Sequence, residues 1–517
     1  MSRPSVTFVL GSGQLGQVAT GNDFISGMIL YGTAPGSFAT TATQAVFSVA
    51  DAESKGITLD YADETLATGS LVISSVGSTG DIIQITVPES VPVSSDYPTG
   101  VKTVTLCTYT QTSADTTSTL LAASIAAAIN ANSYLTATGT LTGYTASAST
   151  GTITFTARQG LGINLNTNSV TATVTGTIAT GTNTAFSGGV YSKKAVWHYQ
   201  VSEYFRGNPT GKLWIHFRAS AQSTFAEVST IQTAANGEIK QLAIFNPATK
   251  TATTFSTDLA ALQTQCDTLF TLYTPLVIHY TANTKAISDY STLVNLQTKS
   301  AQNVMEVIMQ DGAATGAQLY INSGISMGNV GYTLGTTSAL AVNENIGVGT
   351  NNISNDVEMA VPALTNGIRM SAVTSGLKDQ LDAYRYCFAD NQPGVTGTYI
   401  NEDWTSVIST SDYNRQSRVR VINKAVRLLY ANLFPLLKSQ IQLNPDGTLT
   451  EVAAQTFIGA CIPTKAAMAN EVSGMSITVN RAQNVINTGK VVIGVRIQPT
   501  VSADFIEVDL SFTAKLS

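Results

Sequence analysis

The amino-acid sequence predicts a multidomain protein of mixed α+β and α/β class, and three observations lead to this prediction. The chain has 517 residues, which corresponds to about three or four domains of ordinary size. Short apolar runs alternate with helix-length segments through much of the chain, as they do in an α/β layered domain. A stretch rich in Thr and Ser, with the alternation typical of strands, interrupts this pattern between residues 58 and 189.

The first part of the chain predicts two strands and a short helix. Residues 5–10 and 25–31 are apolar strand candidates separated by a glycine-rich segment. Residues 45–56 (AVFSVADAESKG) are typical of a helix closed by a glycine. We therefore expect a terminal strand segment over 1–20, followed by the first piece of an α/β body over 21–57.

The Thr- and Ser-rich stretch predicts an α+β module, rich in β-strands, inserted into the body at residues 58–189. Its expected helix covers residues 115–130, in which Leu121, Ile125 and Ile129 fall at helical spacing. Its expected strands are 81–87, 102–109, 134–140 and 152–157. Such an insertion is tolerated at a surface loop because closing a longer loop costs little entropy.

The body is expected to resume over 190–398, where strands and helices alternate. Segments 193–205, 257–271 and 289–302 have the length of helices. The expected strands are 212–218, 241–245, 276–280 and 305–310. The body is therefore predicted to be discontinuous in sequence, with the module between its two pieces.

The C-terminal part predicts an α+β domain over 399–487 and a strand arm over 488–517. Its core helix is expected at 413–442, capped by Asp412 and finished near Pro435. The other expected elements are a turn at 444–447, a helix at 450–460 and strands at 476–480, 490–497 and 506–513.

The expected core helix has two faces of opposite character. Its apolar face carries Val419, Ile422, Val426, Leu429, Leu433 and Leu436. Arg420, Lys424 and Arg427 form a basic stripe on the opposite face, in a chain with only 12% charged residues. The stripe is a solvated face paired with nearby carboxylates or a docking surface for an acidic partner. A nucleic-acid contact is the third and least favoured alternative, because no aromatic residues alternate with the basic ones.

The composition and charge argue against several function classes. Lys and Arg number 27 and Asp and Glu 33, so the net charge of −6 does not favour binding to nucleic acid or anionic membranes by bulk charge. The four cysteines, at 107, 266, 387 and 461, are far apart and are expected to be buried thiols in a reducing compartment. The N-terminus does not resemble a signal peptide, and no apolar run is long enough for a membrane span, so we expect synthesis in a cytoplasm without export by a standard signal.

Two short motifs of the chain match catalytic sequence patterns, but each lacks a second feature that the corresponding site requires. Residues 11–16 fit GxGxxG, but residues 21–23 (GND) interrupt the helix that a dinucleotide site requires. Residues 324–328 fit GxSxG, but the three histidines, at 198, 216 and 279, all precede the serine, whereas an α/β-hydrolase places its base after it. We therefore expect no enzyme, no cofactor and no metal site.

Both chain ends alternate apolar and polar residues as strands do, and each is joined to the rest by a segment that contains glycine. Free terminal strands can pair with the sheet edge of a neighbouring subunit, or they can complete the sheet of their own domain. The candidate inter-subunit strand residues are Val6, Phe8, Leu10, Val491, Ile493, Val495 and Ile497.

One ordered set of segments carries a family resemblance. The segments are 52–56 (AESKG), 343–347 (NENIG), 396–403 (TGTYINED), 412–415 (DYNR), 420–427 (RVINKAVR), 444–450 (NPDGTLT), 491–497 (VVIGVRI) and 506–510 (IEVDL). In this order they resemble a contractile tail sheath protein of phages and related contractile injection systems. The inserted module lies outside the resemblance.

The resemblance implies a structural subunit that polymerises helically around a tail tube and contracts to drive the tube through the envelope of a target cell. The place it implies is a virion tail or an injection-system sheath, assembled in the cytoplasm of a bacterial host. The partners it implies are other copies of the chain, the tail tube protein, and baseplate and tail terminator proteins, with no direct nucleic acid and no membrane insertion.

The resemblance also implies linking arms at 1–20 and 488–517, and a C-terminal domain that faces the tube. Arg420, Lys424 and Arg427 are then the candidate tube-docking residues, unless the helix that meets the tube is segment 450–472. The alternatives to a sheath are another virion structural protein, such as a tube or capsid subunit, and a surface adhesin.

Overall fold

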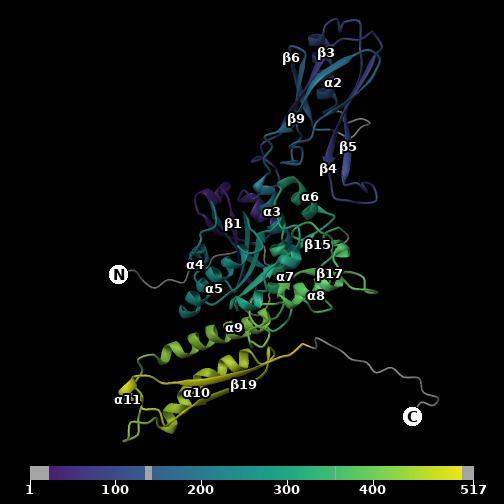
Figure 1. Cartoon of the computed structure of the whole chain (residues 1–517). Helices are drawn as coiled ribbons and strands as arrows, with labels where there is room; N and C mark the ends of the chain where they lie inside the picture. Colours follow the sequence, from purple (N-terminus) through teal and green to yellow (C-terminus); the bar gives the residue numbers. More distant parts are fainter. Residues whose placement is uncertain (1–21, 134–141, 356, 503–517) are drawn as a thin grey trace, which may run out of the picture.

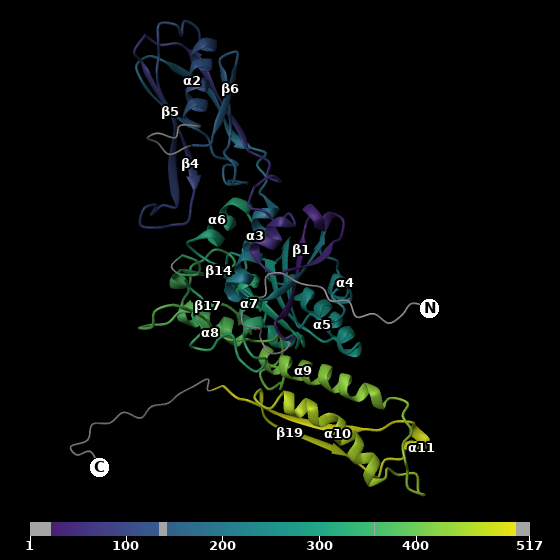
Figure 2. The same cartoon turned by 180° about the vertical axis from the view of Figure 1, so that it is seen from behind.

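The computed structural model describes residues 22–133, 142–355 and 357–502 of a mixed α/β protein with several separate sheets, which confirms the expected fold class. An inserted module (β3 to β9) stands at one end of an elongated molecule (Figure 1). An α/β body (β1 to α1 and α3 to β18) lies in the middle, and a C-terminal unit (α9 to β20) lies at the other end, as the reverse view also shows (Figure 2).

The body is built on a seven-stranded sheet in which all neighbouring strands are parallel except β10 and β2. In sheet order the strands are β16 (Tyr386–Cys387), β13 (Val304–Val307), β12 (Val277–Asn283), β11 (Gln241–Thr249), β1 (Ile25–Tyr31), β10 (Lys212–Arg218) and β2 (Thr43–Val46). Every residue of β1, an inner strand of the sheet, is buried, because helices cover both faces of the sheet.

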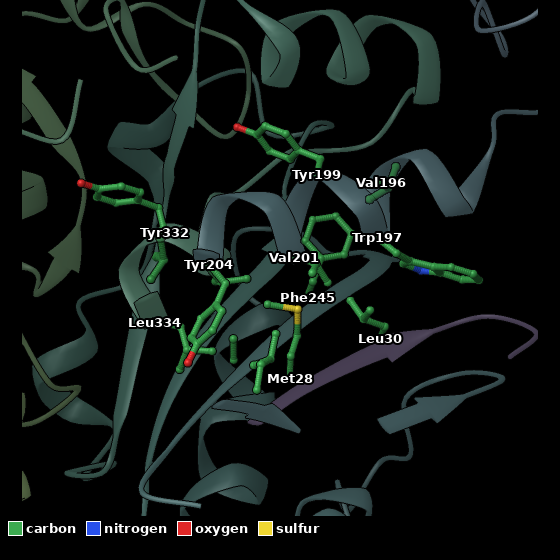
Figure 3. Close-up of a cluster of buried hydrophobic side chains, with 14 of the residues drawn as sticks. Met28, Leu30, Val196, Trp197, Tyr199, Val201, Tyr204, Phe245, Tyr332 and Leu334 are labelled. Carbon is green, nitrogen blue, oxygen red and sulfur yellow. The ribbon is translucent and has the colours of Figure 1, made fainter. Parts of the chain in front are cut away.

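The helices of the body form two layers, each with its own hydrophobic core. One layer contains α3 (Lys193–Gly207), α6 (Thr315–Ser323) and α7 (Val330–Ala339), and the other contains α4 (Glu227–Ala234), α5 (Phe255–Thr271) and α8 (Ser375–Ala383). Figure 3 shows the first core, where Tyr204 of α3 and Leu334 of α7 lie over Met28 of β1.

The smaller elements of the body include one that differs from the sequence prediction. Two antiparallel strand pairs form small sheets of their own: β14 (Met309–Asp311) with β15 (Pro362–Leu364), and β17 (Ala389–Asn391) with β18 (Thr398–Ile400). The helix expected at 289–302 is wrong, because two 3-10 turns form there, η2 (Tyr290–Thr292) and η3 (Leu296–Thr298). Asp289 and Asn295 accept hydrogen bonds from backbone amides two residues on, and such local bonds compete with a continuous helix.

The segment at 45–56 is only partly helical. Its first residues belong to β2, and α1 (Val49–Ser54) begins after Ser48, whose hydroxyl accepts the backbone N–H of Asp51 at 3.1 Å. η1 (Gly36–Ala39) precedes both elements, and η4 (Met370–Ala372) precedes α8.

The inserted module has two antiparallel sheets, one helix and a core of its own. The strands of the first sheet are, in order, β6 (Thr145–Ser149), β7 (Thr152–Thr156), β3 (Thr68–Ser75) and β9 (Ala179–Ser187). Those of the second sheet are β5 (Val101–Thr110), β4 (Ile82–Ser90) and β8 (Thr171–Thr175). The helix is α2 (Ser118–Ser133). The strand expected at 134–140 lies outside the described residues.

The C-terminal unit pairs two long helices with a β-hairpin. Its elements are α9 (Gln416–Leu433), η5 (Phe434–Leu436), α10 (Glu451–Ala467), β19 (Val472–Val479), α11 (Val485–Thr488) and β20 (Ile493–Pro499). The core helix is shorter than 413–442 and ends at the 3-10 turn that contains Pro435, as a proline would dictate. The expected strands at 5–10 and 506–513 lie outside the described residues.

The predicted helix cap at Asp412 is wrong. Residues 411–414 form a turn ahead of the helix, and the side chain of Asp412 is exposed. The buried carboxylate of Asp403 instead accepts the backbone N–H of Ser417 in the first turn of α9, at 2.7 Å. Burial raises the pKa of this carboxyl to about 6.

Candidate assembly surface of the C-terminal unit

The basic stripe of α9 faces the α/β body and not the solvent. Arg420 is 4% exposed, and its guanidinium donates to the backbone carbonyls of Leu340 and Ala341, both at 3.1 Å. These carbonyls lie at the end of α7, where a cation also complements the helix dipole.

The other two cations of the stripe meet one carboxylate of the body. The Lys424 ammonium lies 2.6 Å from the carboxylate of Asp23 and 2.6 Å from that of Glu471. Arg427 donates to the backbone carbonyl of Pro275 at 2.9 Å and lies 3.5 Å from Asp23. The three side chains thus clamp the C-terminal unit to the body.

The pKa values of the stripe follow from this position. Burial lowers the pKa of Arg420 and that of Arg427, each to about 10, against the favourable field of Asp23. Burial also disfavours the charge of Lys424, but the bonds to Asp23 and Glu471 outweigh it and raise the pKa of this group. All three remain charged at neutral pH, and their partners lie within the chain. Two of the three side chains thus pair with carboxylates, and the docking role expected for the stripe stays a prediction.

The apolar face of α9 lines a groove of about 420 Å³ beside β20. Ile422, Val426 and Leu429 form one wall, and Val495 and Ile497 of β20 form the other. These side chains are only partly buried, so the groove is an apolar surface open to solvent.

The strand beside this groove has one unpaired edge among the described residues. β20 pairs with β19 in an antiparallel hairpin, in which Ile497 lies opposite Met475 and Arg496 opposite Ser476. Along β20, Ile493, Val495 and Ile497 point inward, and the residues between them are exposed. The free edge therefore offers backbone donors and acceptors beside an apolar groove.

A larger cavity of about 750 Å³, with both polar and apolar lining, adjoins the groove where the body, α9 and the end of β20 meet. Arg418 and Pro499 line both hollows. Beyond β20 the chain passes along this cavity, where Asn343 donates to the Thr500 hydroxyl at 3.1 Å and Arg415 donates to that of Ser502 at 3.2 Å.

The seven residues predicted for inter-subunit strands fall into three groups. Val6, Phe8 and Leu10 lie outside the described residues. Ile493, Val495 and Ile497 lie on β20. Val491 precedes β20 and packs, partly buried, against a small apolar cluster that contains Leu449 and Val485.

The second predicted helix, α10, carries exposed charges only near its two ends, at Glu451 and Lys465, and none between them. Val452 and Ile462 are exposed, while Ala453, Phe457 and Cys461 of the same helix are buried. The surface that α10 offers to a partner is therefore mainly apolar.

The serine of the GxSxG match and the histidine at 279 are both buried and hydrogen-bonded within the fold. Ser326 of the GxSxG match is 1% exposed, and its hydroxyl donates to the carbonyl of Thr365 at 2.6 Å. His279 is fully buried between Thr333 and Gln416, and burial lowers its pKa to about 3. The four cysteines are buried free thiols, as expected.

Two searches of the described ranges complete the survey. In 22–133, 142–355 and 357–502, His, Cys, Asp and Glu side chains do not gather in threes around a point that could hold a metal ion. Over the same part of the chain, none of the helices combines the length and apolar character that a bilayer crossing requires.

The chain was compared with curated proteins, solved structures and protein-family models. No curated protein matches the sequence, whereas the other two comparisons each give a similarity. Among solved structures, the chain is similar to a chain in the cryo-EM structure of the anti-feeding prophage (AFP) baseplate, 6-fold symmetrised, with a TM-score of 0.40 and 15% identity over 61% of this chain and 80% of that one. Residues 412–517, which include α9, α10 and the β19–β20 hairpin, match the family model described as DUF2586, C-terminal domain.

Proposed function

We propose that this chain is a non-enzymatic structural subunit of a contractile tail sheath, in a phage or a related injection system. Copies polymerise helically around a tail tube, and the sheath shortens to drive the tube through a target envelope. The observation that carries the proposal is the unpaired edge of β20 beside the apolar groove of α9.

A strand from a neighbouring copy fits this edge in two ways. Its backbone would extend the hairpin by ladder hydrogen bonds, and its alternate side chains would enter the groove. The N-terminal arm has the required pattern, because Val6, Phe8 and Leu10 are apolar at every second position.

Strand donation from one copy to the next is a heterologous contact. Such contacts use two different surfaces and form a helical polymer when the rotation does not close into a ring. The inserted module lies at the end of the molecule opposite the C-terminal unit (Figure 1), so a polymer joined through C-terminal units leaves the modules outermost.

The low charge of the chain agrees with repeated self-contact. In a polymer every like-charge repulsion is repeated at each interface, and a surface of Thr, Ser and Asn avoids it. The exposed face of α10, which has no charged residue between Glu451 and Lys465, is the surface we propose for contact with the tube. It takes the place of the basic stripe, whose side chains bind groups within the chain.

Electron microscopy of the concentrated, purified full-length chain tests this proposal. We expect hollow cylinders with a helical repeat. In a sedimentation experiment, the same sample should contain fast-sedimenting polymers. Closed shells would favour a capsid subunit, and globular particles at every concentration would contradict a polymerising role.

A further inference from the structure

We propose that a polar cleft between the inserted module and the body binds a carboxylate-bearing unit of an acidic polysaccharide. The cleft has a volume of about 490 Å³, which falls in the range of about 300–1,000 Å³ typical of small-molecule sites. The inference goes beyond the proposed function, because it concerns a ligand of the single folded subunit and does not depend on polymerisation.

The cleft lies where β4 and β5 of the module reach α6 of the body (Figure 1). Lys102 of β5 and Arg158, which follows β7, line the module side of the cleft. Gln318 and Asn322 of α6 line the body side, and Gln318 donates to the carbonyl of Ser90, the last residue of β4, at 3.5 Å. Both parts of the molecule therefore form the walls of one hollow.

The distribution of charge in the module points to an anionic ligand. Lys102 and Arg158 are the only basic residues between positions 58 and 189, whereas seven Asp and Glu residues lie in the same range. Both basic residues line this cleft. A module of negative net charge thus places all its positive charge at one hollow, where it attracts an anion.

The buried carboxylate of Glu89 orients Arg158 and leaves part of its guanidinium open. Arg158 donates to the two oxygens of Glu89 through Nε and one terminal nitrogen, both at 2.9 Å, and Tyr144 donates to the same carboxylate at 2.7 Å. The other terminal nitrogen of Arg158 forms no hydrogen bond within the described ranges, and this side chain is 39% exposed. A planar guanidinium fixed in this way can donate charge-assisted hydrogen bonds to a second carboxylate.

Lys102 supplies the second positive charge of the cleft. It lies directly opposite Glu89 on the neighbouring strand, yet its ammonium forms no ion pair with any described residue of the chain. Because Arg158 and Tyr144 already engage Glu89, the Lys102 ammonium is available to the carboxylate of a ligand.

The uncharged side chains of the cleft suit the hydroxyl groups of a sugar. Tyr61 and Tyr97 line it, and neither phenol hydroxyl is hydrogen-bonded within the part of the chain that the structure describes. The backbone of Tyr61 has a φ of 51°, a strained conformation for a bulky residue, and such strain concentrates at binding sites. An acidic sugar uses both the cations and these neutral groups, whereas a simple anion uses the cations alone.

Calorimetric titration of the full-length chain with the linear trimer of galacturonic acid tests the proposal. The methyl ester of this trimer has the same sugar rings without the charges and is the matched probe. We expect saturable binding of the acid, and binding of the ester that is weaker by at least about tenfold. Lys102→Gln should weaken binding of the acid by a similar factor, and Lys490→Gln, at an exposed position of the C-terminal unit, is the control variant.

Several outcomes overturn the proposal. These are no binding of the trimer, equal binding of the acid and its ester, and unchanged binding by a folded Lys102→Gln variant. Inorganic phosphate and a tri-glutamate peptide are titrated in the same way, and tighter binding of either would assign the cleft to that class of anion instead. The comparison of acid and ester uses the unaltered chain, so it decides the matter even if the variant does not fold. None of these results depends on whether the chain forms cylinders, so a failure here leaves the proposed function untouched.

Discussion

The Lys424 ammonium lies 2.6 Å from the carboxylate of Asp23, so one ion pair joins the first residues of the body to the core helix of the C-terminal unit. Both side chains are mostly buried, and Arg427 shares the same carboxylate. The joint between the two parts is therefore held by a charge cluster as well as by apolar packing.

Asp23→Asn tests the strength of this joint. The change leaves Lys424 and Arg427 with fewer compensating charges at a site largely removed from water. We expect the free energy of unfolding to fall by about 1–3 kcal/mol, measured by urea denaturation. The exposed Asp96 serves as the control, and a loss no larger than that of Asp96→Asn would contradict the role of the joint.

Arg420→Ala tests whether the basic stripe is structural. The substitution leaves the carbonyls of Leu340 and Ala341 without their donor, and we expect a loss of about 2–4 kcal/mol by denaturation. A variant with unchanged stability that no longer co-sediments with tubes would instead restore the docking role first expected for this residue.

The face that α9 turns to the body could not be predicted from its own sequence. Helical spacing correctly separates Ile422 and Val426 from Arg420 and Lys424. Which face is covered depends on Asp23, about 400 residues earlier in the chain, and no local pattern links the two. An isolated apolar stripe suggests burial, yet here the apolar stripe lines an open groove and the charged stripe is covered.

Other differences have local causes. The sequence does not predict strand β9, because six of its nine residues are exposed and its sequence, ATGTNTAFS, has no apolar alternation. The strands of the body were predicted well, because parallel strands buried on both faces are continuous apolar runs.

The cap of α9 gives a matched pair of variants. Asp403→Ala removes the acceptor for the Ser417 N–H, and we expect a loss of about 1–2 kcal/mol in the free energy of unfolding. Asp412→Ala changes an exposed side chain outside the helix and should have almost no effect. Equal losses in thermal or urea unfolding would show that Asp403 is not the cap.

His279 predicts a defined pH dependence of stability. Its folded-state pKa is about 3, below the ordinary value near 6.5, because the ring is buried. The unfolded chain therefore takes up a proton first, so this contribution to stability is complete above pH 6.5 and is lost as the pH falls toward 3.

His279→Gln should flatten this dependence. Between pH 7 and pH 5 we expect the wild-type chain to lose about 2 kcal/mol more than the variant, measured by urea unfolding at each pH. Parallel pH profiles would mean that the histidine is not held neutral by its surroundings.

The groove gives a direct prediction for assembly. Val426→Glu places a charge on its wall, and we expect folded subunits that do not polymerise, judged by sedimentation. Thr103→Glu, on an exposed position of β5 in the inserted module and outside the groove, is the control. Normal polymers of the Val426 variant would exclude the groove from assembly.

A cryo-EM map of the assembled polymer tests the central claim most directly. The account predicts that a strand from a neighbouring copy pairs with the free edge of β20 and places alternate apolar side chains in the groove of α9. A polymer in which this edge stays unpaired, or in which copies meet only through other surfaces, would contradict it.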